Sequence, residues 1–230
     1  MFYSADFSVN NVVLNDEETH HLVRVLRMNV GDVCEIIDGK GNIFTAKITK
    51  INKKSCEFFI QNIQFFPKKE YEFHLAIAPT KSIDRMEFMV EKCVELGINT
   101  ITFLLTEHSE RKQINLERIQ KIAIAALKQS QQKYLPKIED MISFKQFIAY
   151  DFQNTQCFLA HLDKDTKPLK SLIAPQKNTL ILIGAEGDFS PNEILLAKNK
   201  NFQSVSLGES RLRTETAGLY ANFVYKWINE

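Results

Sequence analysis

The chain has 230 residues, of which 44% are hydrophobic and 25% are charged, and its formal net charge at pH 7 is +1. This composition is typical of a globular protein with a substantial core and excludes a disordered chain. The balanced charge argues against a protein that coats nucleic acid by bulk electrostatics. The longest apolar stretches, such as 179–183, are far shorter than the ~20 residues that span a bilayer, and no basic-then-apolar signal pattern opens the chain. We therefore expect a soluble, cytoplasmic protein with no membrane partner.

The N-terminal part of the chain predicts mostly β-structure. Segments 32–38 and 42–49 alternate and are rich in β-branched residues, and Asp38-Gly39-Lys40-Gly41 between them is typical of a hairpin turn. A second turn at 52–55 leads into a third strand at 56–65. These strands predict a small barrel.

One short helix is expected to interrupt these strands. Asp16 is placed to cap it, and apolar residues follow near helical spacing at Leu22, Val23, Val25 and Leu26. Between residues 21 and 69 basic side chains outnumber acidic ones, so this stretch is suited to attract phosphates. A solvated outer face of a sheet explains the same charges equally well.

At Pro67-Lys68-Lys69-Glu70 the predicted pattern changes from consecutive strands to alternating strands and helices. We place a domain boundary there, between residues 1–69 and 70–230. Beyond it, strands at 73–78 and 100–105 flank a helix with an apolar stripe, which Gly97 ends. The stripe consists of Met86, Met89, Val90, Cys93 and Leu96.

The remaining elements continue this alternation of strands and helices. A helix at 116–131 precedes strands near 157–160, 179–183 and 204–207, and a last helix spans 215–228. We expect this last helix to point four apolar side chains inward, those of Leu219, Phe223, Val224 and Trp227. The alternation predicts an α/β domain in which helices cover both faces of a parallel sheet.

The chain lacks the sequence motifs of several common catalytic and nucleotide-binding sites. The chain has no HExxH pair, no GxSxG elbow, no GxxxxGK[ST] phosphate loop and no GxGxxG dinucleotide turn. The four cysteines are scattered without a CxxC pair, so we expect reduced thiols and no metal site.

Two glycine turns stand out instead. The strand at 179–183 runs into Gly184 and Gly187, and Ser190-Pro191-Asn192-Glu193 then opens a helix with an N-cap serine, an N1 proline and an N3 glutamate. Gly208 ends the next strand, before the last helix. Glycines at the carboxyl ends of parallel strands let the backbone approach a ligand closely, although a plain β-to-α turn explains one such pattern as well.

Together the two turns are suited to wall an adenosine-sized pocket. The run Arg213-Thr-Glu-Thr216 is unusual for a helix start, although capping by its threonines and the helix dipole also explain it. We expect ligand contacts from Leu182, Ile183, Gly184, Glu186, Gly187, Leu207, Gly208, Leu212, Arg213 and Thr214.

The two turns carry a family resemblance. Ile183-Gly-Ala-Glu-Gly-Asp-Phe-Ser190 and Leu207-Gly-Glu-Ser-Arg-Leu-Arg-Thr-Glu-Thr-Ala217 resemble the paired signatures of the ribosomal RNA small subunit methyltransferase E family. The likeness extends to Lys81, 91–92, 95–97, 106–107, 109–111, 129–130 and Pro136, and to 21–27 and 31–41. It implies an N-terminal PUA-like barrel followed in the chain by a SPOUT-class domain. In that class a C-terminal trefoil knot forms the cofactor pocket.

The resemblance also implies an activity. It is methyl transfer from S-adenosylmethionine to N3 of a uridine in the decoding region of 16S ribosomal RNA, by a homodimer that acts on the RNA or the small subunit. Arg213 is the candidate for charge stabilisation or phosphate anchoring, and Glu215 or a solvent path for accepting the proton. The candidates for RNA contacts are Arg24, Arg27, Lys47 and Arg111.

The chain departs from the family pattern at several positions. Ala185 replaces a usual proline, Asp188 a usual glycine, and Glu209-Ser210 a frequent proline-arginine pair. Lys128 and Gln132 stand where glutamate and arginine are common. The glycines and the Leu-Arg-Thr-Glu-Thr run remain, so the departures bear on RNA contacts around 128–132 rather than on the cofactor.

Two other functions fit the same residues. One is a non-catalytic RNA-binding or ribosome-assembly factor, which need not bind the cofactor. The other is a related knotted methyltransferase with a different RNA or a different target atom, which only product analysis distinguishes.

Overall fold

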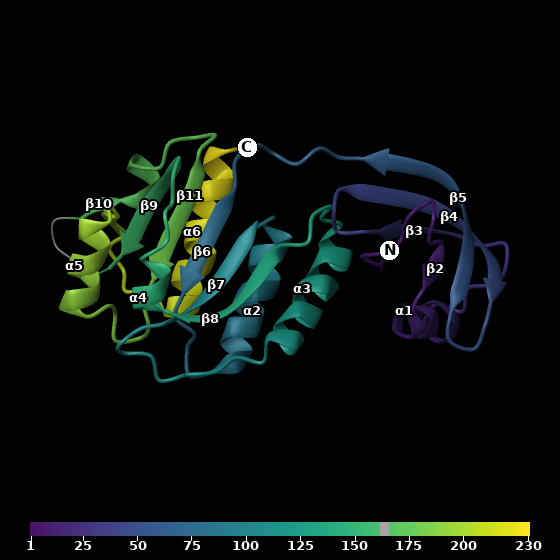
Figure 1. The fold of residues 1–230 in the computed structure, drawn as a ribbon, viewed down its shortest axis with the longest axis horizontal. Coiled ribbons are helices and arrows are strands. Elements are labelled where there is room, and N and C mark those ends of the chain that lie inside the picture. The colour runs from purple at the N-terminus through teal and green to yellow at the C-terminus, as the bar shows by residue number, and fades with distance from the viewer. Residues whose placement is uncertain (162–165) are drawn as a thin grey trace. The chain divides into compact units, whose positions relative to one another are not determined.

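The computed structural model describes residues 1–161 and 166–230, and these divide into two compact units. The first unit comprises 1–68 and 124–135, and the second comprises 69–123 and 136–230. Helix α3 (Leu116–Ser130) therefore contributes residues to both units (Figure 1).

A five-stranded sheet forms the first unit. Its order is β1-β3-β4-β5-β2, with bounds β1 (Phe2–Tyr3), β2 (Val13–Leu14), β3 (Val33–Ile37), β4 (Asn42–Ile51) and β5 (Cys56–Phe65). β1 runs parallel to β3, and the other neighbours are antiparallel. The predicted hairpin is confirmed, because the Oδ1 of Asp38 accepts the N–H groups of Lys40 at 2.7 Å and Asn42 at 3.1 Å.

The helix of the first unit starts and ends differently from the prediction. Its N-cap is Asn15, not Asp16, since the Asn15 side chain accepts the N–H of Glu18. After α1 (Asp16–His20) the chain forms a π-helical turn, η1 (His21–Val25). The wider turn breaks the 3.6-residue repeat. Leu22 is therefore buried, whereas Val25 and Leu26 are 60% and 50% exposed.

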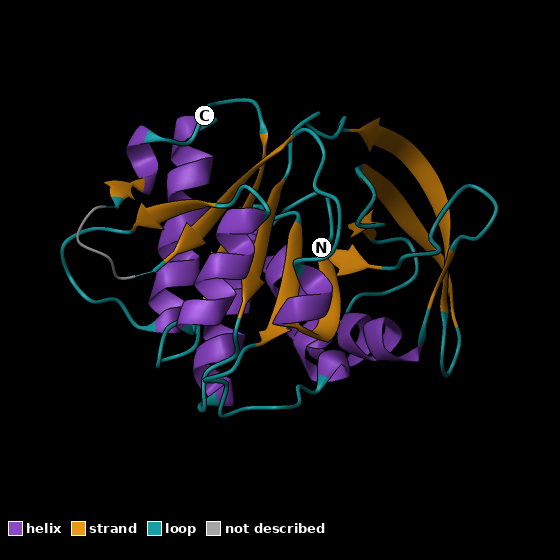
Figure 2. Cartoon of the chain, turned by 60° about the vertical axis from the view of Figure 1, so that its left-hand side comes forward, coloured by secondary structure: helices purple, strands orange, loops and turns teal. Residues whose placement is uncertain are grey.

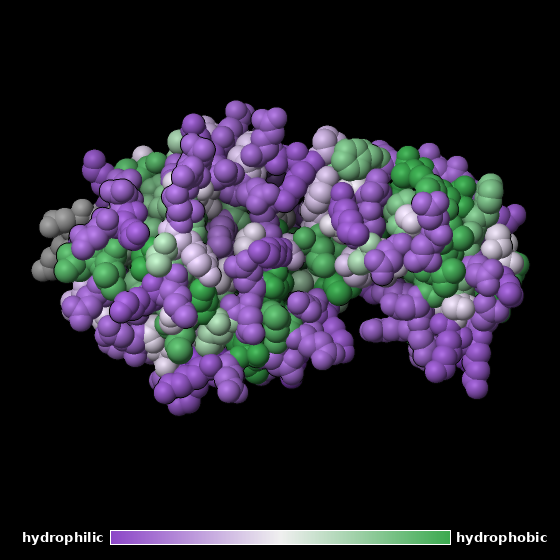
Figure 3. Space-filling view, viewed as in Figure 1, coloured by the Kyte–Doolittle hydropathy of each residue, from purple (hydrophilic) through white to green (hydrophobic). Residues whose placement is uncertain are grey.

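The core of the first unit lies beneath this sheet. It consists of Phe2, Phe7, Leu14, Leu22, Ile36, Phe44, Ala46, Ile48, Cys56 and Phe58. Part of the sheet extends past the core. Figure 3 shows hydrophobic side chains gathered over β4 and β5, and β5 carries the exposed side chains of Phe59, Ile63 and Phe65.

The second unit holds a seven-stranded sheet in which every neighbouring pair is parallel, as predicted. Its order is β10-β12-β9-β11-β6-β7-β8, with bounds β6 (Phe73–Ile77), β7 (Thr100–Leu105), β8 (Lys137–Ser143), β9 (Thr155–Ala160), β10 (Lys167–Pro168), β11 (Asn178–Ile183) and β12 (Gln203–Ser206). Since β12, β9 and β11 are neighbours in the sheet and run parallel, their carboxyl ends meet at one edge.

Helices cover both faces of this sheet (Figure 2). On one face, α4 (Phe144–Phe147) and α5 (Pro191–Asn199) pack with Ala76, Leu180 and Leu182 of the strands. On the other, α2 (Ile83–Glu95) and α6 (Thr214–Ile228) lie together. The predicted α2 stripe is buried except for Leu96, which is partly exposed. A 3₁₀ turn, η2 (Leu169–Ser171), follows β10.

The prediction for the inward face of α6 is partly wrong. Val224 is buried, but Phe223 and Trp227 are 53% and 66% exposed. The helix packs through small residues instead. A Cβ on Gly218 would lie 2.9 Å from Ile77 Cδ1, so the helix backbone approaches the sheet too closely for a bulky side chain there.

All four cysteines are free. Burial raises the pKa of the Cys93 thiol to about 12, so this group stays a neutral thiol at physiological pH. Among the helices of the described residues, none is long and apolar enough to cross a membrane.

Candidate functional site

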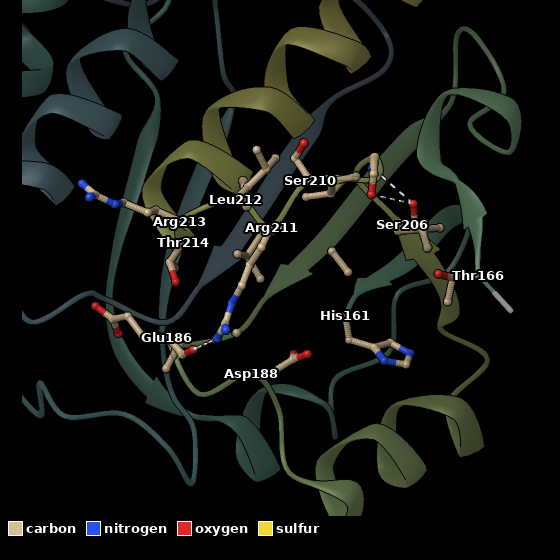
Figure 4. Close-up of a pocket in the computed structure, with 18 of the residues that line it drawn as sticks. His161, Thr166, Glu186, Asp188, Ser206, Ser210, Arg211, Leu212, Arg213 and Thr214 are labelled. Atoms are coloured by element: carbon tan, nitrogen blue, oxygen red, sulfur yellow. Dashed lines mark hydrogen bonds between the residues drawn. The ribbon is translucent and has the colours of Figure 1, made fainter. Parts of the chain in front are cut away.

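A cavity of about 700 Å³ opens at the edge where β9, β11 and β12 end. Its lining comes from the loops after these strands and from the start of α6 (Figure 4). The lining residues are Ala160, His161, Thr166, 183–186, Asp188, 205–214 and Ala217. This volume lies within the range of about 300–1,000 Å³ typical of small-molecule sites.

The loop after β11 forms a tight turn that leaves little room for a side chain at its first position. A Cβ on Gly184 would lie 3.1 Å from both the Asp188 carbonyl carbon and the Phe189 nitrogen. The Asp188 N–H closes the turn on the Ala185 carbonyl at 2.9 Å. The turn therefore holds the backbone of 184–188 along the cavity wall.

The predicted capping box at the start of α5 is confirmed. Ser190 Oγ accepts the Glu193 N–H at 3.2 Å, and Glu193 Oε2 accepts the Ser190 N–H at 2.9 Å. The other carboxylate oxygen of Glu193 accepts the N–H of Glu107 at 3.0 Å. This buried carboxylate thus ties the turn to the loop after β7.

The loop after β12 uses its glycine differently. Gly208 has a φ of +122°, which strains other residues, and a Cβ there would meet nothing within 4 Å. Its missing side chain leaves open space in the cavity. The N-cap of α6 is Arg213, without a side-chain capping bond, so threonine capping does not explain the unusual helix start.

Most of the predicted ligand-contact residues lie at this cavity. They are Ile183, Gly184, Glu186, Leu207, Gly208, Leu212, Arg213 and Thr214. The other two lie outside its lining. Leu182 is buried in the core beside α4 and α5, and a Cβ on Gly187 would lie 3.1 Å from His108 Cβ. Ligand binding by any of these residues stays a prediction.

The two candidate catalytic residues lie at the start of α6. The Arg213 side chain extends away from His161, toward the side on which the Glu186 carboxylate lies (Figure 4). Glu215 is 8% exposed and does not line the cavity. Its Oε1 lies 4.0 Å from Arg85 Nε, and its Oε2 is buried without a hydrogen-bond partner among the described residues.

Among the described residues that line the cavity, sequence reasoning missed four ionisable ones, namely His161, Asp188, Glu209 and Arg211. His161 follows β9 and contacts Ser204 Oγ through its Nε2 at 2.9 Å. Arg211 donates from Nη2 to the Glu186 carbonyl at 3.3 Å, and Asp188 lies nearby (Figure 4). Because His161 follows the carboxyl end of a strand, its place in the cavity could have been predicted, but only if β9 was known to adjoin β11.

The four candidate RNA-contact residues belong to different units. Arg24, Arg27 and Lys47 are exposed in the first unit. Arg111 belongs to the second, where its guanidinium donates to the carbonyls of Thr80 and Lys81. Arg111 therefore holds the loop after β6 as well as offering a positive charge.

Comparison with known proteins assigns both parts of the chain. Residues 67–225 match the family described as RNA methyltransferase domain, and 14–61 match the RNA methyltransferase PUA domain. Among solved structures, a probable rRNA-methyltransferase from Porphyromonas gingivalis is 40% identical with a TM-score of 0.92, over 99% of this chain and 97% of that one. A ribosomal RNA small subunit methyltransferase E from Neisseria gonorrhoeae, bound to S-adenosyl methionine, is 27% identical with a TM-score of 0.88, over the same shares.

Curated relatives agree with this assignment. Ribosomal RNA small subunit methyltransferase E of Buchnera aphidicola subsp. Acyrthosiphon pisum is 34% identical over 220 residues, which cover 90% of this chain and 84% of that protein. The protein of the same name from Synechocystis sp. is 31% identical over 212 residues, which cover 90% of this chain and 69% of that protein. The chain therefore belongs to the ribosomal RNA small subunit methyltransferase E family.

Proposed function

We propose that this protein transfers the methyl group of S-adenosylmethionine to N3 of a uridine in 16S ribosomal RNA. The observation that carries the proposal is the cavity walled by two glycine turns at the carboxyl ends of parallel strands. The Neisseria gonorrhoeae relative, whose fold this chain shares, was solved with S-adenosyl methionine. The names of the curated relatives support ribosomal RNA of the small subunit as the substrate.

The cavity fits this cofactor in size and chemistry. Its apolar lining includes Ile183, Val205, Leu207 and Leu212, which suit the faces of an adenine ring. The backbone groups of the two loops are suited to hydrogen-bond the edge of the base and the ribose. When bound, the cofactor supplies an electrophilic methyl group on a sulfonium, and no metal is required for its transfer.

The protein's own task is to make uridine N3 nucleophilic. N3 carries a proton, so forming its bond to carbon requires that proton to leave, while the bond between methyl carbon and sulfur breaks. We assign Arg213 to stabilise negative charge on the uracil ring or to anchor a phosphate, because a guanidinium stays charged and offers directed donors. The proposed proton acceptor is Glu215, with one buried oxygen that has no partner among the described residues, or a path through solvent.

We infer a division of labour in which residues 1–69 hold RNA and 70–230 perform the transfer. Lys47 on β4 pairs across the sheet with Phe59 on β5, and both side chains are exposed. A basic side chain beside an exposed aromatic ring suits an unpaired nucleotide, because the ring stacks on a base and the ammonium attracts phosphate. N3 methylation requires an unpaired or flipped base, which agrees with this surface.

We also propose a homodimer with a C-terminal trefoil knot, acting in the cytoplasm where its RNA substrate is found. The support for the dimer is the apolar row Leu219, Phe223 and Trp227, spaced four residues apart on α6. Phe223 and Trp227 are more than half exposed, and exposed apolar patches often mark interfaces.

The nucleoside product tests the proposal directly. Small subunits from cells that lack this protein are incubated with the purified protein and labelled cofactor, and the digested RNA is analysed by mass spectrometry against standards. We expect the label in N3-methyluridine. Label on carbon 5 or on a ribose oxygen would favour a different target atom, and a protein that binds RNA but no cofactor would favour an assembly factor.

A further inference from the structure

The cavity has an apolar part and a charged part. Aliphatic side chains from β11, β12 and the loop before α6 line the first part. In the second part, His161, Asp188 and Arg211 lie near one another (Figure 4). A ligand that fits both parts has an apolar ring at one end and charges of both signs at the other.

Arg211 spans the gap between the two glycine loops. It belongs to the loop after β12, and its Nη2 reaches the Glu186 carbonyl of the loop after β11. This bond uses one N–H, whereas a guanidinium carries five, arranged in a planar fork that matches a carboxylate. Arg211 can therefore keep its link to Glu186 and still bind an anion.

The loop geometry fixes the Asp188 carboxylate. Asp188 has a φ of +61°, its Oδ1 accepts the N–H of Phe189 at 2.7 Å, and its carbonyl contacts His108 Nδ1 at 2.9 Å. These contacts hold the backbone and one carboxylate oxygen in place. A carboxylate held in this way offers a fixed partner for an ammonium group.

Two other charged residues of the lining, Glu186 and Arg213, face elsewhere. Glu186 Oε1 accepts the N–H of Lys81 at 3.3 Å, and the side chains of Glu186 and Arg213 point away from Asp188 (Figure 4). Asp188 and Arg211 are thus two described residues of opposite charge that line the charged part of the cavity.

We propose that Arg211 and Asp188 form a subsite for the amino-acid end of the cofactor, with Arg211 on its carboxylate and Asp188 on its ammonium. The inference rests on the proposed function, which it makes more specific. The subsite determines which adenosine thioethers bind, because ligands without the amino acid can form neither ionic interaction.

Four ligands separate the two interactions by calorimetry on the full-length protein. S-Adenosylmethionine and S-adenosylhomocysteine carry both charged groups, decarboxylated S-adenosylmethionine keeps only the ammonium, and 5′-methylthioadenosine has neither. We expect Arg211→Ala to weaken the first two ligands by roughly 10- to 100-fold and the other two by less than about 2-fold. Asp188→Asn should weaken the first three and spare 5′-methylthioadenosine.

Arg118→Ala is the matched control, because it removes an exposed arginine of the same unit that does not line the cavity. Arg211→Leu keeps much of the side chain's bulk and should reproduce the pattern of Arg211→Ala. If the Arg211 variants weakened all four ligands equally, Arg211 would only link the loops, and the subsite would be disproved. If the wild-type protein bound none of the four ligands, the proposed function itself would fail.

Discussion

His74 Nε2 and Thr102 Oγ1 lie 2.7 Å apart on the neighbouring strands β6 and β7. The Thr102 hydroxyl has one hydrogen, which it donates to Glu139 Oε2 at 2.8 Å. His74 must therefore donate its Nε2–H to Thr102, which fixes the tautomer of the neutral ring. Burial is the largest influence on this imidazole and lowers its pKa to about 4.

This pKa predicts a stability loss in mild acid. Well above pH 6.5 the ring is neutral in both states, and as pH falls through 6.5 toward 4 the unfolded chain binds a proton that the folded protein does not. At pH 5 the free energy of unfolding should be lower by about 2 kcal/mol from this group. Urea unfolding at pH 7 and pH 5 measures it. His74→Gln should remove this part of the loss, the exposed His20→Gln should not, and equal losses in all three proteins would contradict the assignment.

Gly208→Val should abolish cofactor binding, because the added side chain enters open cavity space. Gly31→Val is a matched control, since Gly31 also has a positive φ, +102°, and open space around its Cβ position, but it does not line the cavity. Both variants carry similar backbone strain, so only the loss of binding separates them. Unchanged affinity in a folded Gly208→Val protein, measured by calorimetry, would rule this pocket out.

Replacing Arg24 and Arg27 by alanine should weaken RNA binding and leave cofactor affinity unchanged. For each arginine that neutralises a phosphate, its removal should flatten the log-log dependence of RNA affinity on salt by roughly one unit. Fluorescence anisotropy with a fragment of 16S RNA at several salt concentrations measures the slope. A slope and affinity equal to those of the wild type would mean that these arginines do not contact RNA.

Arg213→Ala should lower methyl transfer by about 10²–10³-fold, the typical effect of losing one preorganised charge stabiliser (~2.7–4 kcal/mol). Arg213→Lys should restore little of the rate if the planar geometry matters and much of it if only the charge matters. Single-turnover transfer to small subunits at saturating cofactor gives the rate. Full activity in Arg213→Ala would remove this residue from the chemistry.

Phe223→Lys combined with Trp227→Lys should convert a dimer into a monomer, because charges would then occupy the apolar row on α6. Both side chains are already exposed, so folding should survive, as circular dichroism would check. Sedimentation at micromolar concentration gives the mass. A wild-type protein that sediments as a single species of 26.6 kDa would disprove the dimer.

The sequence predicted the features that depend on local residue chemistry. The capping box at Ser190, the hairpin at Asp38 and the parallel alternation of the second unit all follow from short-range patterns. The prediction that Phe223 and Trp227 face inward was wrong, because apolar spacing does not tell which side of a helix meets the sheet. Here close backbone packing at Gly218 decides it.

Other features depend on pairings between distant segments. The place of His161 in the cavity requires that β9 adjoin both β11 and β12, and no local pattern gives that strand order. β8 was missed because most of its residues are only partly buried and form no apolar run. Nothing in the local sequence around Arg211 indicates its position, which depends on its reach to the Glu186 carbonyl in another loop.

The two-part make-up of the first unit limits how the protein can be dissected or recombined. Lys128 Nζ lies 2.6 Å from Glu18, whose side chain is almost fully buried, and Lys133 and Leu135 bond to the hairpin glycines through their backbones. A graft of residues 1–69 onto another enzyme would remove the cation of Glu18 and the backbone partners of both hairpin glycines, so the first unit would lose these stabilising contacts. An exchange of RNA-binding modules must therefore also transplant residues 124–135 and helix α3, to which part of this segment belongs.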